Sequence, residues 1–335
     1  MLNNKSILVT GGTGSFGKKF VEIALKKYKK INRLIVFSRD ELKQSEMSQI
    51  YKGKKFENIR FFLGDVRDKE RLIRASRDMD IIVHAAALKQ VPVAEYNPME
   101  FIKTNIIGAS NIIEAAITCN VKKVIALSTD KAASPLNLYG ASKLCADKLF
   151  IAANHYAGGR NVKFSVVRYG NVMGSRGSVV PFWQKMIDQG ATMLPVTDQR
   201  MTRFWITLPR GVQFVLDGLE RMIGGEVFVP KLPSINIVDL ARCMLPDCEI
   251  QDVGIRPGEK LHEVMVPMDD ARNTIEFDDH YVIEPNFQFW DRKGFSEQNG
   301  GKAVPDDFEY NSGTNPWVMT ADELRELLRS QGTKI

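Results

Sequence analysis

Short runs of apolar residues recur at regular intervals through the first half of the chain, and longer amphipathic segments separate them. The runs occupy residues 7–9, 34–37, 60–63, 81–83, 124–127 and 164–167. Short strands that are apolar throughout are typical of a parallel sheet that helices cover on both faces. The pattern therefore predicts an α/β fold with a Rossmann-like, doubly wound parallel sheet, whose first helix spans 18–27.

The pattern changes after Gly170, where apolar runs become shorter and prolines and glycines more frequent. Three further elements are predicted there: a helix over 208–222, a strand over 226–229, and a helix over 234–244 that Ser234 caps. A length of 335 residues suits two domains. We predict a first domain over 1–170, with 205–233 returning to it, and a smaller, mostly C-terminal region made of 171–204 and 234–335.

Composition and charge exclude several classes of protein. Apolar residues make up 44% and charged residues 26% of the chain, as in ordinary globular proteins. No run of about 18 apolar residues occurs, so we expect no membrane span. Residues 7–9 already form a predicted strand, so we expect no secretory signal and a cytoplasmic location. The net charge of +6 comes without a nucleic-acid-reading module, which favours anionic small molecules over nucleic acids as partners.

A glycine-rich loop joins the first predicted strand to the first helix. Residues 10–17 read Thr-Gly-Gly-Thr-Gly-Ser-Phe-Gly, with glycines at every third position from 11 to 17. Such a loop turns tightly and lets a pyrophosphate approach the backbone at the helix N-terminus. The predicted dinucleotide contacts in this loop are Gly11, Thr13, Gly14, Ser15, Phe16 and Gly17.

The end of the second strand favours NADP over NAD. NAD-binding folds usually place an acid there to hold the ribose hydroxyls. In this chain Ser38 stands at that place, and Arg39 offers a guanidinium for a 2′-phosphate, with Lys43 nearby. Asp40 lies one residue later and favours the NAD alternative. The remaining predicted cofactor contacts follow the third and fourth strands: Asp65, Val66, Ala85, Ala86 and Ala87.

Tyr139 and Lys143 form a Y-x-x-x-K motif, which places both side chains on one helix face. An ammonium near a phenol stabilises the phenolate, so we expect a lowered pKa for Tyr139. A phenolate beside a nicotinamide is suited to take a proton from an alcohol or sugar hydroxyl while hydride leaves. His262-Glu263 lacks a second histidine at metalloprotease spacing, so no metal site is predicted.

The glycine loop followed by Tyr139 and Lys143 resembles the extended short-chain dehydrogenase/reductase superfamily. Residues 128–132 read Ser-Thr-Asp-Lys-Ala and end the fifth predicted strand. Retaining sugar-nucleotide 4,6-dehydratases carry Asp-Glu there, whereas Asp130-Lys131 resembles the configuration-inverting UDP-N-acetylglucosamine 4,6-dehydratase family. That family takes part in pseudaminic acid and other surface glycan synthesis. Further segments that match it are 85–89, 168–171, 175–181, 201–205 and 254–260.

This resemblance implies a reaction and assigns roles to four residues. Tyr139, supported by Lys143, takes the proton of the sugar 4-hydroxyl while NADP accepts hydride from carbon 4. Lys131 then removes the hydrogen on carbon 5, which requires a neutral amine and hence a lowered pKa. Asp130 donates a proton to the leaving 6-hydroxyl, and hydride returns to carbon 6. Lys131 reprotonates carbon 5 from the opposite face, which gives UDP-2-acetamido-2,6-dideoxy-β-L-arabino-hex-4-ulose and regenerates NADP.

The resemblance also implies further contacts and an oligomer. Residues 1–170 are expected to bind NADP, with contacts that include Lys89, Asn105 and Tyr169, although Asn105 could equally cap or bridge a helix. Predicted contacts to UDP-N-acetylglucosamine are Lys89, Lys131, Asn171, Ser178, Val179, Val180, Pro181, Arg203, Arg256 and Glu259. Arg203 could instead pair within the fold. A homo-oligomer, a dimer or hexamer, is expected.

Three alternatives stay open at the level of sequence. A UDP-hexosamine 4-epimerase needs no acid–base pair beyond the tyrosine, so Asp130-Lys131 argues against it. A retaining dehydratase differs at the position of Lys131. A regulator built on an inactive NADP-binding fold would not need Tyr139 and Lys143, and both are present.

Overall fold

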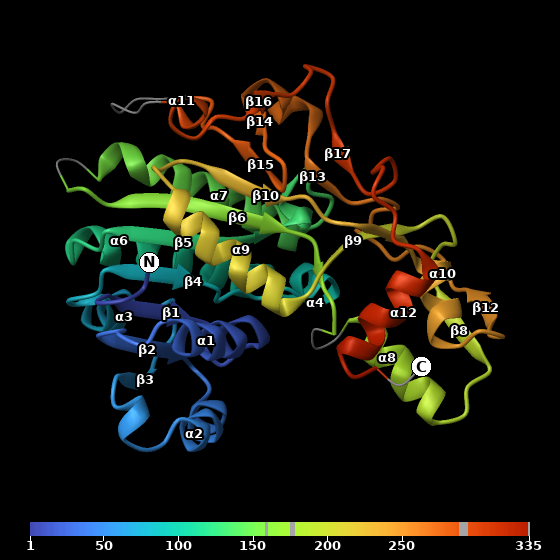
Figure 1. Ribbon diagram of the computed structural model, residues 1–335, viewed down its shortest axis with the longest axis horizontal. Helices are drawn as coiled ribbons and strands as arrows, with labels where there is room; N and C mark the ends of the chain where they lie inside the picture. Colours follow the sequence, from blue (N-terminus) through green and yellow to red (C-terminus); the bar gives the residue numbers. More distant parts are fainter. Residues whose placement is uncertain (158–159, 175–177, 288–293, 334–335) are drawn as a thin grey trace.

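One ten-stranded sheet with helices on both faces dominates the computed structural model, which describes residues 1–157, 160–174, 178–287 and 294–333 (Figure 1). The strand order is β16-β14-β15-β10-β6-β5-β4-β1-β2-β3, and the strands from β3 to β10 run parallel. The parallel strands are β1 (Ser6–Thr10), β2 (Arg33–Ser38), β3 (Ile59–Leu63), β4 (Ile81–His84), β5 (Lys123–Thr129), β6 (Lys163–Tyr169) and β10 (Val227–Pro230). The predicted doubly wound α/β sheet is therefore confirmed.

Helices cover both faces of this sheet. On one face α1 packs beside α9, and on the other α6 packs between α3 and α7 (Figure 1). The helices of this part are α1 (Ser15–Lys27), α2 (Glu41–Ile50), α3 (Lys69–Ser76), α4 (Val91–Tyr96), α5 (Pro98–Phe101), α6 (Gly108–Thr118), α7 (Leu138–Tyr156) and α9 (Leu208–Arg221). Short 3-10 turns form η1 (Lys54–Phe56) and η3 (Asp130–Ala132), and η2 (Ile102–Ile107) is a π-helix. The two faces bury an apolar core, which explains why most residues in the middle of these strands are apolar.

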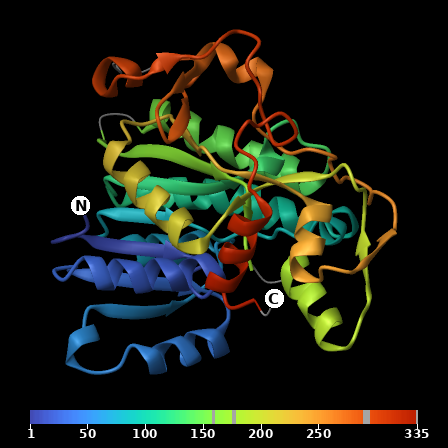
Figure 2. The same ribbon diagram turned by 45° about the vertical axis from the view of Figure 1, so that its right-hand side comes forward.

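A second, smaller core lies beside one end of the sheet, as the two views of the ribbon show (Figures 1 and 2). Trp183, Leu240 and Leu324 are fully buried there and belong to three different helices. The elements of this part are β7 (Asn171–Val172), α8 (Val179–Asp188), β8 (Met193–Val196), β9 (Thr202–Ile206), β11 (Ser234–Asn236), α10 (Ile237–Met244), β12 (Glu249–Asp252) and α12 (Ala321–Ser330). Since β7 begins two residues after β6 ends, the chain enters this part from the carboxyl edge of the sheet.

The prediction of a helix capped by Ser234 is wrong at its beginning. Ser234–Asn236 pairs with β9 as strand β11, and the side chain of Asn236 accepts a hydrogen bond from the Val238 amide to cap α10. The helix thus begins three residues later than predicted. Pairing with β9 satisfies the backbone of this segment in a way that a local capping pattern does not reveal.

Three late strands return to the large sheet. They are β14 (Thr274–Glu276), β15 (His280–Ile283) and β16 (Lys302–Ala303), and β15 pairs antiparallel with β10. Elsewhere in the C-terminal part lie β13 (Val264–Val266), β17 (Tyr310–Asn311), η4 (Met268–Asn273) and α11 (Phe295–Asn299). The division into a cofactor domain and a substrate region stays a prediction. These three strands come from the part of the chain predicted as the substrate region, but they belong to the large sheet. None of the helices in the described ranges is long and apolar enough to span a bilayer.

Candidate active site

The predicted catalytic residues meet where β5 ends and α7 begins. Thr129 is the last residue of β5, and Asp130 and Lys131 form the turn η3 directly after it. Tyr139 stands in the first turn of α7, whose N-cap Asn137 accepts a hydrogen bond from the Gly140 amide at 2.8 Å. A Cβ at Gly140 would lie 2.1 Å from the Lys131 carbonyl oxygen. Only glycine permits this approach, which brings the helix against the turn.

A chain of hydrogen bonds connects Tyr139 to Asp130. The Thr129 hydroxyl donates to Asp130 Oδ1 at 2.8 Å, and the same hydroxyl is hydrogen-bonded to the Tyr139 side chain. Asp130 is fully buried and Tyr139 nearly so. The sequence analysis assigned no role to Thr129, although its place directly before Asp130 at the carboxyl edge of the sheet was a usable signal.

Tyr139 and Lys143 share one face of α7, as their spacing predicts. The amine of Lys143 donates to the Leu127 carbonyl at 2.8 Å. Burial raises the pKa of Tyr139 to about 12, although Lys131 and Thr129 act in the opposite direction. The predicted lowering of this pKa is therefore wrong, because the desolvation of the phenolate outweighs the nearby positive charge. Burial also lowers the pKa of Lys143.

Lys131 lies between two carboxylates. Its Nζ is 3.0 Å from Asp130 Oδ1, 3.1 Å from Glu263 Oε1 and 3.3 Å from Asn171 Oδ1. Burial disfavours the ammonium, but Asp130 and Glu263 outweigh it and raise the pKa of Lys131. The expected lowering of this pKa is wrong because the two carboxylates together outweigh the desolvation of the ammonium. Glu263 was considered only together with His262, as part of a possible metal motif. Its role as an ion-pair partner of Lys131 was not predicted.

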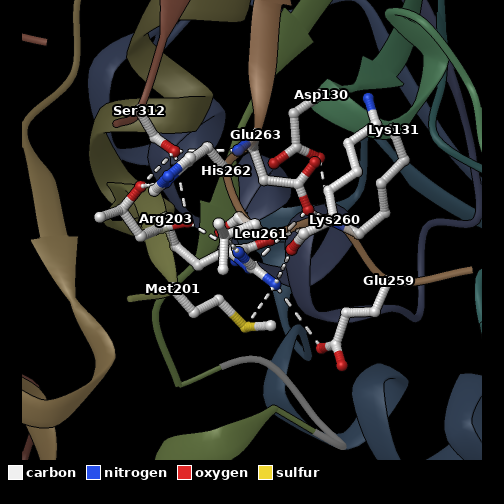
Figure 3. A network of polar contacts seen from close by, with 12 residues as sticks. Asp130, Lys131, Met201, Arg203, Glu259, Lys260, Leu261, His262, Glu263 and Ser312 are labelled. Carbon is white, nitrogen blue, oxygen red and sulfur yellow. Dashed lines mark hydrogen bonds and ion pairs between the residues drawn. The ribbon is translucent and has the colours of Figure 1, made fainter. Parts of the chain in front are cut away.

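Arg203 pairs with other groups of the fold, which is one of the two alternatives predicted for it. Its guanidinium donates to the backbone carbonyls of Lys260 and Leu261, both at 3.0 Å (Figure 3). It also lies 3.6 Å from Glu259 and 3.8 Å from Glu263. A contact between Arg203 and the diphosphate stays a prediction.

Arg256 and Glu259 belong to the segment that passes the start of α7. The Gly258 carbonyl accepts a hydrogen bond from the Asn137 side chain at 2.8 Å. Arg256 is exposed and Glu259 is half-buried. A substrate role for these two residues stays a prediction, and their segment contacts the N-cap of α7.

The glycine loop has the shape that a pyrophosphate requires. Gly11 has a φ of +64°, and a Cβ there would lie 2.8 Å from the Ala85 carbonyl oxygen. Gly14 is the N-cap of α1 and supplies no capping side chain, and the first turn of α1 carries no acid. The amides of this turn therefore remain available for an anion. Thr13 and Gly17 are buried, Phe16 is half-buried and Ser15 is exposed.

The end of β2 places a guanidinium at the surface. Arg39 is more than half exposed, and its Nη1 is 3.8 Å from Asp65 Oδ2. Asp40 caps α2 by accepting from the Lys43 amide at 2.9 Å, and its side chain also pairs with the Lys43 amine. Ser38 accepts from Gln44 at 3.0 Å. Asp40 is thus engaged in capping a helix, whereas Arg39 faces outward.

Residues after β4 lie between the glycine loop and Lys131. The Ala86 amide donates to the Thr10 hydroxyl at 3.4 Å. Asn105, inside the π-helix, bridges the backbone of Leu88 and the Ser142 hydroxyl, and its contact with the cofactor stays a prediction. Burial and the charge of Lys131 lower the pKa of Lys89. Val66 is buried, and Asp65 is held by Arg67 at 2.8 Å.

The remaining predicted contacts follow β6. Tyr169 is buried, and burial together with Tyr139 raises its pKa. Ser178 precedes α8, whose first residues include the half-buried Val179, the buried Val180 and the exposed Pro181. Residues 175–177 of the matching motif lie outside the described residues. Asn171 reaches Lys131. Among the described residues, no hydrogen bond or ion pair joins 178–181 to Tyr139, Asp130 or Lys131, and their substrate contacts stay a prediction.

Comparisons with known proteins agree with this geometry. A family model described as "Polysaccharide biosynthesis protein" matches residues 7–285. A Campylobacter jejuni protein named UDP-N-acetylglucosamine 4,6-dehydratase (inverting) is 54% identical over 332 residues, 98% of either chain. A Rickettsia canadensis protein named UDP-glucose 4-epimerase is 38% identical over 98% of this chain and 96% of its own.

A solved structure shares the whole architecture. The X-ray structure of Pen from Bacillus thuringiensis superposes with a TM-score of 0.89 at 34% identity and covers 100% of both chains. The family match extends over most of the chain and includes both the glycine loop and the predicted catalytic residues Asp130, Lys131 and Tyr139. The chain therefore belongs to the polysaccharide biosynthesis protein family, within the short-chain dehydrogenase/reductase superfamily that its motifs indicate.

Proposed function

We propose that this chain is an inverting UDP-N-acetylglucosamine 4,6-dehydratase that binds and recycles NADP. The observation that carries the proposal is the cluster of Tyr139, Thr129, Asp130 and Lys131 in one connected set of contacts. The base beside Asp130 is a lysine, which distinguishes the site from the Asp-Glu pair of retaining dehydratases. The 54% identical relative carries the same activity in its name.

The residues divide the proton transfers between two positions of the sugar. The chemistry that a bound dinucleotide supplies is the removal of hydride from carbon 4 and its return to carbon 6. Tyr139 takes the proton of the 4-hydroxyl, and the Thr129 hydroxyl connects Tyr139 to Asp130. A proton that enters at Tyr139 can therefore reach Asp130 and replace the one that Asp130 gives to the leaving 6-hydroxyl. In this way the proton lost with the departing water is made up by the 4-hydroxyl proton, and the balance of protons is closed.

Lys131 handles the hydrogen on carbon 5. Once carbon 4 is a ketone, the neighbouring hydrogen is acidic enough for an amine to remove. Lys131 returns a proton to carbon 5 after hydride has reached carbon 6, and return to the opposite face inverts the centre. Asn171 and the two carboxylates hold the amine in place between them.

The glycine loop and the end of β2 would hold the dinucleotide. The uncapped first turn of α1 fits a pyrophosphate, and the exposed Arg39 fits a 2′-phosphate. We therefore expect mass analysis of cofactor released from the purified protein to yield mainly NADP. Recovery of mainly NAD would contradict this assignment and would indicate that Asp40 leaves its helix cap to hold the ribose.

Incubation of the protein with UDP-N-acetylglucosamine tests the function itself. The expected result is a 4-keto-6-deoxy sugar nucleotide whose proton couplings in nuclear magnetic resonance show the inverted configuration at carbon 5. The uninverted 4-keto product would indicate a retaining dehydratase. Interconversion with UDP-N-acetylgalactosamine would indicate an epimerase, the activity that the name of the 38% identical relative carries. Binding without any product would indicate a regulator.

Three broader statements accompany this proposal. The chain acts in the cytoplasm, forms a homo-oligomer, either a dimer or a hexamer, and supplies pseudaminic acid or another surface glycan pathway. The oligomer and the pathway rest on the family resemblance. They are separate from the catalytic assignment, which the reaction with UDP-N-acetylglucosamine tests directly.

A further inference from the structure

We propose that Glu263 is a positioning residue for this reaction: held by Arg203, it fixes the amine of Lys131 against Asp130 so that this pair shares one proton. The inference rests on the proposed function and assigns a specific role in it to a residue that lies outside the segments matched in the sequence. Glu263 lies directly before β13, far along the chain from Asp130 and Lys131.

Hydrogen bonds hold the backbone of Glu263 at both its amide and its carbonyl. Its amide donates to the Ser312 hydroxyl at 2.9 Å, and the Ser312 amide donates to the Glu263 carbonyl at 2.9 Å. The Ser312 hydroxyl also contacts the Thr202 hydroxyl at 2.8 Å (Figure 3). Only 2% of the Glu263 side chain is exposed, so its carboxylate has little freedom to leave Lys131.

The charges of the cluster balance in pairs. Asp130 and Glu263 supply two carboxylates, and Lys131 and Arg203 supply two cations, with Glu263 Oε1 lying 3.1 Å from the amine and 3.8 Å from Arg203 Nε. Burial opposes ionisation of Glu263, but Lys131 and Arg203 outweigh it and lower its pKa. Burial and the charge of Glu263 raise the pKa of Asp130. A proton within the cluster is therefore placed on Asp130 or Lys131 and not on Glu263.

This distribution of charge prepares both groups for the dehydration step. Transfer of one proton from Lys131 Nζ to Asp130 Oδ1, across 3.0 Å, gives a neutral amine and a protonated acid. The amine then takes the hydrogen of carbon 5, the bond between carbon 6 and oxygen breaks, and the Asp130 proton leaves with that oxygen as water. Lys131 is left as an ammonium beside two carboxylates, and Glu263 stabilises it until carbon 5 takes the proton back. The 4-hydroxyl proton, held by Tyr139, then passes through Thr129 to Asp130 and restores the proton that Asp130 and Lys131 share.

Asp130 and Glu263 each have one carboxylate oxygen without a hydrogen-bond partner among the described residues. These oxygens, Asp130 Oδ2 and Glu263 Oε2, are buried. A buried carboxylate oxygen without a partner is costly, and such atoms at a site are expected to gain one from a bound molecule. The other charged and titratable groups around the cluster are Lys89, Tyr139, Arg168, Glu259, Lys260 and His262.

Replacement of Glu263 by glutamine tests the proposal, because it keeps the shape and removes the charge. We expect Glu263→Gln to lower kcat for dehydration about 10- to 100-fold, within the range for a perturbed acid–base pair, with KM little changed. Loss of the negative charge lowers the pKa of both Asp130 and Lys131. Both limbs of the pH–rate profile should therefore move to lower pH, by on the order of one unit. Glu263→Asp keeps the charge and should keep the position of the profile.

A second measurement reads the same coupling without any turnover. Lys131 is about a quarter exposed, so a small acylating reagent can reach its amine, and mass spectrometry can follow the modification against pH. In Glu263→Gln the Lys131 amine should react with the acylating reagent at lower pH than it does in the wild-type protein. Glu276→Gln, which removes the partner of Lys231 outside the site, is the matched control and should change neither measurement.

The outcomes separate this inference from the proposed function. Glu263→Gln could lower kcat without moving either limb of the pH–rate profile and without changing the reactivity of the Lys131 amine. That result would mean that Glu263 is merely structural and would overturn the inference. If the unmodified protein forms no 4-keto product, the proposed function fails. The acylation profile of Lys131 still decides in that case whether Glu263 controls the proton on the amine.

Discussion

The Tyr139→Phe protein is expected to bind dinucleotide and sugar nucleotide but to lose the first oxidation. The phenol is the group that the structure places in hydrogen-bonded connection with Thr129 and Asp130. Removal of its oxygen removes the base for the 4-hydroxyl proton and also cuts the path by which that proton reaches Asp130. Loss of a general base typically costs about 10²- to 10⁴-fold in rate. Substrate-driven reduction of the bound cofactor, followed by absorbance in a single turnover, measures this step.

The control for this substitution is another tyrosine of the same helix. Tyr156 lies at the end of α7 and is 53% exposed, so Tyr156→Phe should leave the single-turnover rate unchanged. Cofactor and substrate binding by Tyr139→Phe should be measured alongside, since the ring still fills its buried position. Near-normal oxidation by Tyr139→Phe would show that a different group takes the 4-hydroxyl proton.

Replacement of Lys131 by alanine is expected to separate oxidation from dehydration. Tyr139 and Lys143 remain, so substrate should still reduce the cofactor. The amine for carbon 5 is absent, so dehydration and exchange of the carbon 5 hydrogen with solvent should fall by about 10²- to 10⁴-fold. The reaction in deuterated water, followed by nuclear magnetic resonance, reads both the exchange and the configuration of any product.

Stability has to be measured with this variant because Lys131 neutralises two buried acids. Asp130 and Glu263 would face each other without their shared cation, and removal of one partner from a buried ion pair is destabilising. Thermal unfolding shows whether Lys131→Ala is folded at the assay temperature, and Lys131→Met supplies a neutral side chain of similar length. Inverted product formed by either variant at ordinary rates would reduce Lys131 to a structural role.

Local patterns in the sequence were sufficient for the main sheet and for part of the site. The apolar runs at 34–37 and 124–127 became central parallel strands because burial on both faces requires apolar residues at every position. The glycine loop, the Tyr139–Lys143 pair and the Asp130-Lys131 dipeptide each depend on residues close together in the chain. Helix spacing and the common edge of parallel strands were enough to bring them to one place.

Long-range contacts determined the rest, and no local pattern contains them. Glu263 reaches Lys131 from a distant segment, and backbone carbonyls of that same segment engage Arg203. The pKa directions of Tyr139 and Lys131 are opposite to those predicted. At Tyr139 burial outweighs the nearby ammonium of Lys131, and at Lys131 the carboxylates of Asp130 and Glu263 outweigh burial. The strand at Ser234–Asn236 has the same origin, since its backbone partners belong to β9. Spacing indicated which groups could act, whereas packing set how they are charged and what holds them.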